Sequence, residues 1–174
     1  MWVAYYRRDW WRLLRAATAL VRHAFALPWP ATLHAAWLLL HANRLWAPPH
    51  DDADGARRCM RRFYSLVARR HGERLDAERA ARLEVDWWRA HRAREYGAAD
   101  GEGSPLVEAL VALYAHVYDV APDDVRQAAE QRALAMEHSD RWVAGGCEPG
   151  SVLIEQERVA LVRSYAALLA AVHC

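Results

Sequence analysis

Residues 33–46 read Leu33-His34-Ala35-Ala36-Trp37-Leu38-Leu39-Leu40-His41-Ala42-Asn43-Arg44-Leu45-Trp46, and this stretch decides the fold. As a helix it is apolar on nearly every side, which is typical of a helix buried among others. His34 and His41 are seven residues apart, so two helical turns place both imidazoles on one face. Buried polar side chains need hydrogen-bond partners. We therefore expect a central, buried second helix that places two histidines inside a helical core.

Outward from this stretch the chain predicts only helices, because Ala, Leu, Arg and Glu dominate and no apolar run alternates like a strand. The expected helices cover about 2–26, 31–47, 53–70, 76–96, 104–117, 122–144 and 152–173. Prolines or glycines separate most of them, and the segment 97–103 is interpreted as a surface loop. A chain of 174 residues fits one domain. We expect a single compact all-α bundle of about seven helices over residues 1–174.

Composition limits the function classes. The formal net charge is +1, which gives no general attraction to nucleic acid. All 23 basic residues are arginine, so no lysine can form a Schiff base, and the Ala- and Arg-rich usage is typical of GC-rich bacterial coding. The three cysteines, at positions 59, 147 and 174, form no CxxC pair and favour a reducing compartment. Because no signal-peptide pattern or run of 18 apolar residues is present, we expect a cytoplasmic protein with no membrane partner.

Two helical segments carry candidate acid–base residues besides the histidine pair of residues 33–46. Glu84 and His91 share a face two turns apart, with Trp88 between them. A carboxylate beside tryptophan can be desolvated, which raises its pKa and suits it to act as a general acid or base. His116 and Asp119 are three residues apart and can meet at one site. The structural alternatives, a surface ion pair of Glu84 and a solvated His–Asp pair, stay open.

The helix expected at 122–144 has two charged residues on its inward face. Arg132 and Asp140 occupy positions where apolar side chains are expected, and they are too far apart along one helix to pair. Each therefore needs a partner elsewhere or a ligand. The alternative is a structural ion pair that ties two helices together.

No cofactor is expected from the motifs. The Glu-x-x-His pairs of a di-iron bundle and the His-Glu-x-x-His of zinc peptidases are absent, so no metal site is predicted. Glycine-rich phosphate loops and Gly-x-Ser-x-Gly are also missing. The acids at 51, 52 and 54 are better explained as a helix N-cap than as a metal–diphosphate motif.

Nine tryptophans are many for this length. Those at 2, 10 and 11 share a helix with several arginines, a pattern found at membrane surfaces, although packing on the protein's own bundle is the preferred interpretation. The remaining tryptophans, especially Trp37, Trp87, Trp88 and Trp142, can line a pocket for a flat or apolar ligand. The alternative is that they fill a large core.

The first hypothesis is an enzyme for a small apolar or aromatic molecule that uses acid–base chemistry without a cofactor: hydrolysis, elimination or cyclisation. Its pocket is expected among the second, fourth, fifth and sixth helices. The catalytic candidates are His34, His41, Glu84, His91 and Asp140. The substrate-binding candidates are Trp37, Arg44, Trp88, His116 and Arg132.

The second hypothesis is a non-catalytic helical module that binds a ligand or associates with itself, for example as a homodimer. The polar side chains inside the bundle are then structural. DNA binding is a third and weaker interpretation, supported only by arginines on one face of residues 53–70, and no nucleic-acid partner is expected.

Overall fold

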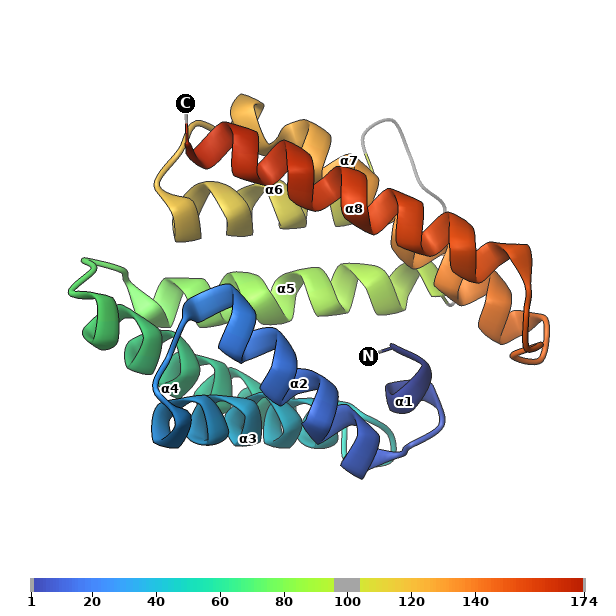
Figure 1. Ribbon diagram of the computed structural model, residues 1–174, viewed down its shortest axis with the longest axis horizontal. Coiled ribbons are helices and arrows are strands. Elements are labelled where there is room, and N and C mark those ends of the chain that lie inside the picture. Colours follow the sequence, from blue (N-terminus) through green and yellow to red (C-terminus); the bar gives the residue numbers. More distant parts are fainter. Residues whose placement is uncertain (1, 96–103, 174) are drawn as a thin grey trace. The chain divides into compact units, whose positions relative to one another are not determined.

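The computed structural model describes residues 2–95 and 104–173 (Figure 1). Within these ranges it contains eight helices and no strands, which confirms the all-α class and corrects the expected number of seven helices. The expected loop at 97–103 lies outside the described residues. The chain forms two compact units, Met1–Val85 and Asp86–Cys174. The expected single domain remains a prediction.

The first unit contains α1 (Trp2–Tyr6), α2 (Trp10–Phe25), α3 (Trp29–Trp46) and α4 (Ala53–His71). The additional helix arises because the segment expected as one helix at 2–26 breaks at residues 7–9. Arg8 adopts a left-handed conformation with φ of 52°, and the Asp9 carboxylate then accepts a hydrogen bond from the backbone N–H of Arg12. Asp9 thus begins a second helix as an N-cap.

Helix α3 is the central helix of the first unit, and it packs against both α2 and α4 (Figure 1). It buries one side, where small side chains such as Ala35 and Ala36 allow the neighbouring helices to approach. The other side is open, since Leu33 is 55% and Trp37 is 50% exposed. A sequence that is apolar all round did not reveal this open face.

Helix α4 has the ends that its sequence predicts. The Asp52 carboxylate accepts a hydrogen bond from the Gly55 N–H at 2.7 Å, which confirms the N-cap interpretation of the acidic run. A Cβ atom at Gly55 would lie 2.1 Å from Asp52 Oδ2, so a larger residue there would displace the capping carboxylate. At the other end Gly72 has a φ of 70° and supplies the left-handed C-cap.

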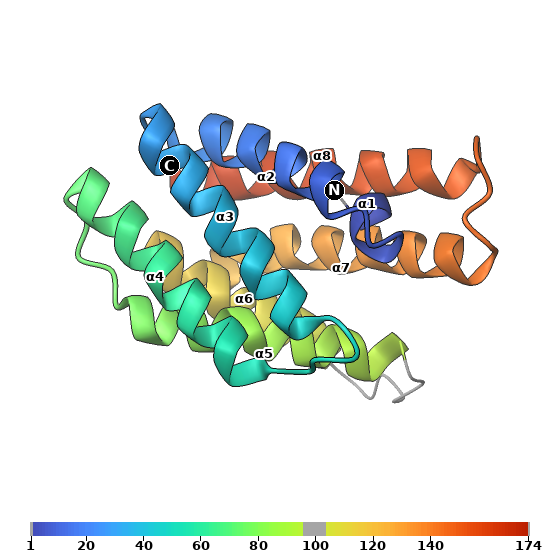
Figure 2. The same ribbon diagram turned by 90° about the horizontal axis from the view of Figure 1, so that it is seen from below.

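The boundary between the units falls within α5 (Ala77–Glu95). The second unit continues with α6 (Pro105–Tyr118), α7 (Pro122–Ala144) and α8 (Val152–Val172). Helices α7 and α8 lie side by side over much of their length (Figure 2). The Ser164 hydroxyl donates a hydrogen bond of 2.8 Å to the Ala128 carbonyl, and Ala128 is fully buried. Small side chains at this contact let the two backbones approach closely.

Helix α8 packs through a narrow face. Its buried positions are Ala160, Ser164 and Leu168, whereas Tyr165 is 46% exposed. Because α8 is apolar on more than one side, its pattern could not show which side packs on α7.

No described helix combines the length and the apolarity that crossing a bilayer would require.

Candidate functional site

The second unit contains a buried charged cluster between α5 and α7, which we call the His91–Asp140–Arg94 cluster. His91 Nε2 lies 3.1 Å and 3.2 Å from the two carboxylate oxygens of Asp140. Arg94 Nη2 donates to Asp140 Oδ2 at 3.1 Å. The three side chains are only 9%, 19% and 17% exposed for His91, Asp140 and Arg94, respectively. Asp140 thus connects its helix to two side chains one turn apart on α5.

The charge of Asp140 is maintained by these neighbours. Burial alone raises the pKa of Asp140, because desolvation disfavours the carboxylate. The hydrogen bonds and charges of His91 and Arg94 outweigh that effect, so the pKa of Asp140 lies below its ordinary value. The cluster is therefore anionic at its centre and cationic on the α5 side at neutral pH.

Other polar atoms of the second unit are buried near this level of α7. Ser139 Oγ and His138 Nδ1 have no hydrogen-bond partner within the described part of the chain. Arg132, one of the predicted ligand-binding residues, has Nη1 3.4 Å from the Tyr165 hydroxyl on α8. Trp88 is 7% exposed and His116 is half-buried on α6.

The remaining predicted site residues belong to the first unit. His34 is exposed, so the expectation that both histidines lie inside the core is wrong for His34, whereas His41 is half-buried. The His41 ring is stacked on Trp37 with 6.0 Å between ring centroids, and both side chains lie on the open face of α3. The guanidinium of the exposed Arg44 lies 6.0 Å from the centre of the Trp10 ring.

Glu84 has a defined partner in the first unit. It accepts a hydrogen bond of 2.7 Å from the Tyr64 hydroxyl on α4. This contact ties α5 to α4 and is a structural use of the carboxylate.

Of the ten predicted site residues, the structure brings together two pairs, the stacked rings of Trp37 and His41 and the hydrogen-bonded His91 and Asp140. The second pair is the buried one. Sequence reasoning selected Asp140 from its inward position and His91 from the face it shares with Glu84 and Trp88, but it missed Arg94 and Tyr64. Arg94 had a local signal, because it follows His91 by three residues and shares its face. Tyr64 had none, since its contact with Glu84 spans 20 residues of sequence.

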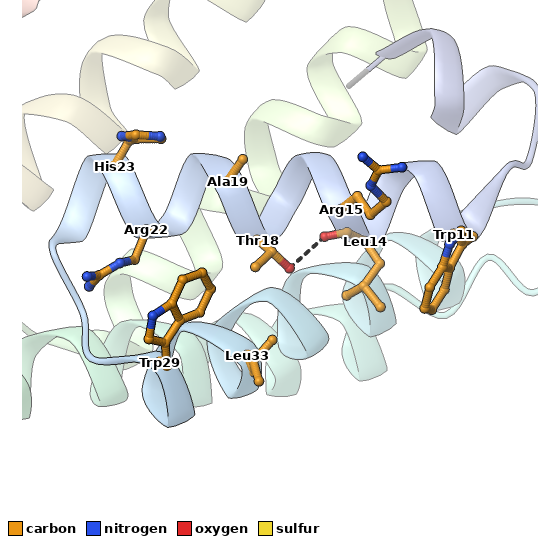
Figure 3. Close-up of a pocket in the computed structure, with 9 residues that line it drawn as sticks. All are labelled: Trp11, Leu14, Arg15, Thr18, Ala19, Arg22, His23, Trp29 and Leu33. Atoms are coloured by element: carbon orange, nitrogen blue, oxygen red, sulfur yellow. Dashed lines mark hydrogen bonds between the residues drawn. The ribbon is translucent and has the colours of Figure 1, made fainter.

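A second candidate site is a surface groove of about 460 Å³ between α2 and α3 (Figure 3). The α2 side chains Leu14, Thr18 and Arg22 face Trp29 and Leu33 of α3, as Figure 3 shows. Trp11 closes one end of the groove. We call this feature the α2/α3 groove.

The α2/α3 groove is aromatic and cationic. Trp11 is 71% and Trp29 is 60% exposed, which is unusual for such large apolar side chains. The Arg22 guanidinium lies 5.3 Å from the centre of the Trp29 ring and also donates to the Leu27 carbonyl. Arg15 and His23 line the groove as well. No aspartate or glutamate occurs in residues 10–50, so no acid of this segment neutralises these cations.

Sequence reasoning noted the tryptophans and arginines near the N-terminus but assigned them to packing. The signal that could have found the groove is the acid-free run of residues 10–50.

Within the described ranges, no group of three or more His, Cys, Asp or Glu side chains is arranged to hold a metal ion. Comparisons with protein-family models, curated proteins and solved structures gave no match to this chain.

Proposed function

We propose that this protein binds a small amphipathic anion, with the ligand lying in the α2/α3 groove. The observation that carries the proposal is an open groove whose walls are exposed tryptophans and whose charged residues are all basic. This proposal develops the ligand-binding alternative of the sequence analysis. The groove volume of about 460 Å³ is within the range of small-molecule sites.

The chemistry of the groove defines the ligand class. Trp11, Trp29 and Leu33 offer an apolar surface that is costly to leave in water, so a ligand with a chain or ring gains free energy by covering it. Arg22 and Arg15 favour a negatively charged head group, and guanidinium binds carboxylate or phosphate in a paired geometry. The ligand therefore combines an apolar body with one anionic group.

Decanoate is a suitable probe, with decanol as the uncharged ligand of equal chain length. Titration calorimetry should show decanoate binding up to about fivefold more tightly than decanol, because a favourable contact with a cation is worth up to about 1 kcal/mol at such exposure. The preference should fall with added salt. Equal affinity for the two ligands would contradict an anion site.

Matched variants locate the binding. Trp29→Ala should weaken decanoate binding about tenfold or more, since it removes an aromatic wall of the groove. Trp37→Ala is the control, because Trp37 is an exposed tryptophan of the same helix that does not line the groove. Arg15→Gln should weaken binding about three- to fivefold, whereas Arg12→Gln, on the same helix but outside the groove, should not. An equal loss in Trp37→Ala would place the ligand elsewhere.

Acid–base catalysis at the His91–Asp140–Arg94 cluster is a second candidate function. The hydrogen bond between His91 and Asp140 supports it, because a carboxylate that fixes an imidazole is a recurring arrangement in general acid–base catalysis. It ranks second because His91 is only 7% exposed. The pocket expected for this chemistry remains a prediction.

An activated ester, 4-nitrophenyl butyrate, tests the catalytic candidate by its release of nitrophenolate. Catalysis at the cluster predicts that turnover falls at least a hundredfold in His91→Gln and is unchanged in Trp29→Ala, which alters the other unit. His116→Gln is the control for a histidine of the same unit outside the cluster. Turnover that survives in His91→Gln would remove His91 from the mechanism.

A further inference from the structure

Helix α8 carries an apolar stripe on a face that its own unit leaves uncovered. Val152, Val159, Val162 and Leu169 are 67%, 41%, 61% and 59% exposed. Together with the exposed Glu155 and Ala166 they occupy positions 152, 155, 159, 162, 166 and 169, which alternate in steps of three and four. This is the a/d spacing of a coiled-coil helix. We call these six residues the α8 seam.

The α8 seam is separate from the contact with α7. The buried residues Ala160, Ser164 and Leu168 follow one another in steps of four and lie on another face of the helix. Ser164 marks that face as the one on α7, through its hydrogen bond to the Ala128 carbonyl. The seam is therefore available to a further helix.

We propose that the α8 seam is a homodimer interface, in which α8 packs antiparallel against α8 of a second copy of the chain. The seam matches itself in this direction. Val152 lies opposite Leu169, Glu155 opposite Ala166 and Val159 opposite Val162. Each of these pairs occurs twice in the dimer, because the twofold axis relates the two copies. Every valine and leucine of the seam then meets an apolar side chain.

The charged residues on and beside the α8 seam favour a second copy of the chain as the partner, and they favour an antiparallel arrangement of the two helices. Glu155 is the one charged residue in the seam, and Arg163, one turn before Ala166, comes next to it from the other copy. Arg163 has no ion-pair partner among the described residues, and Glu155 has only an exposed contact with Arg158 at 3.9 Å. A parallel pair would instead place Glu155 against Glu155, which is repulsive.

Sedimentation equilibrium of the full chain tests the dimer. The wild-type chain should approach the mass of two copies at micromolar concentrations. Val162→Arg should weaken the dimer at least tenfold, because it introduces a charge at the centre of the seam; as Val162 is 61% exposed, folding is preserved. Leu20→Arg, at an exposed leucine of the first unit, is the matched control. A monomeric wild-type chain, or a dimer that Val162→Arg leaves intact, would overturn the proposal.

Charge exchange and cross-linking test the direction. Glu155→Arg should weaken the dimer, and Glu155→Arg combined with Arg163→Glu should restore it. Under oxidation, a mixture of the Val152→Cys and Leu169→Cys chains should form a mixed disulfide, as opposed Cα atoms in such a layer are close enough. Val152→Cys alone should not cross-link through its introduced thiol, because the two copies of position 152 lie about 25 Å apart along the antiparallel pair. The unmodified chain controls for its native cysteines, and self-cross-linking at position 152 would contradict the antiparallel arrangement.

Discussion

Replacing Asp140 by asparagine will lower the free energy of unfolding by about 3 kcal/mol at neutral pH. The variant keeps the shape of the side chain but removes the charge that His91 and Arg94 share. Arg94 is only 17% exposed, so its guanidinium would stay largely out of water without a compensating anion. The loss of one partner of a buried pair costs far more than the pair itself contributes.

The loss should depend on pH in a definite direction. The folded-state pKa of Asp140 is depressed, so its contribution is complete above the unfolded value of about 3.9 and disappears as the pH falls through the folded pKa. The difference between wild type and Asp140→Asn should therefore shrink in acid. Urea unfolding at pH 7 and at successively lower pH measures it. Glu137→Gln, at an exposed acid on the same helix, is the control, and a difference independent of pH would exclude the charge as its cause.

Replacing Phe63 by alanine should have a still larger effect, a loss of about 4 kcal/mol in the free energy of unfolding. Phe63 is 3% exposed in the first unit. Its ring meets the edges of two aromatic neighbours, Phe25 at 5.6 Å and Tyr64 at 5.4 Å between ring centroids. Alanine would leave a cavity between α2 and α4, where the Phe63 ring now packs, and would remove the contacts with both neighbouring rings.

Phe63→Leu is the matched variant, because it keeps much of the apolar volume while losing the aromatic contacts. It should cost about 1–1.5 kcal/mol, and the pair of variants thus separates ring geometry from cavity formation. Thermal or urea unfolding followed by circular dichroism provides the measurement. If Phe63→Ala lost no more stability than Phe63→Leu, the space around Phe63 would not be a packed core.

Local sequence signals accounted for most helix ends. The Asp52 cap, the Gly72 stop and the proline at the start of α6 depend on a few neighbouring residues, so they were visible in the chain itself. The break before Asp9 was missed because tryptophans and arginines continue through it at helical spacing. A left-handed residue at Arg8 has no strong sequence signature.

The site was harder to predict from the sequence. Helical periodicity shows which residues share a face of a helix, but it does not show which other helix packs against that face. His34 and His41 do share a side of α3, but that side is the open one. His91 and Asp140 were both chosen, yet their pairing joins residues 49 positions apart and could not be inferred from either helix alone. On α8, apolar residues on two faces concealed which one meets α7.

The cap of α4 also constrains the order in which this sequence can change. A side chain at Gly55 would collide with the Asp52 carboxylate and approach Leu45 Cδ1 to 3.0 Å. Position 55 can therefore accept alanine more readily after Asp52 has become a shorter capping residue such as serine. The reverse order passes through an intermediate sequence with a damaged helix start. We therefore expect the effects of substitutions at positions 52 and 55 on the stability of the start of α4 to be non-additive.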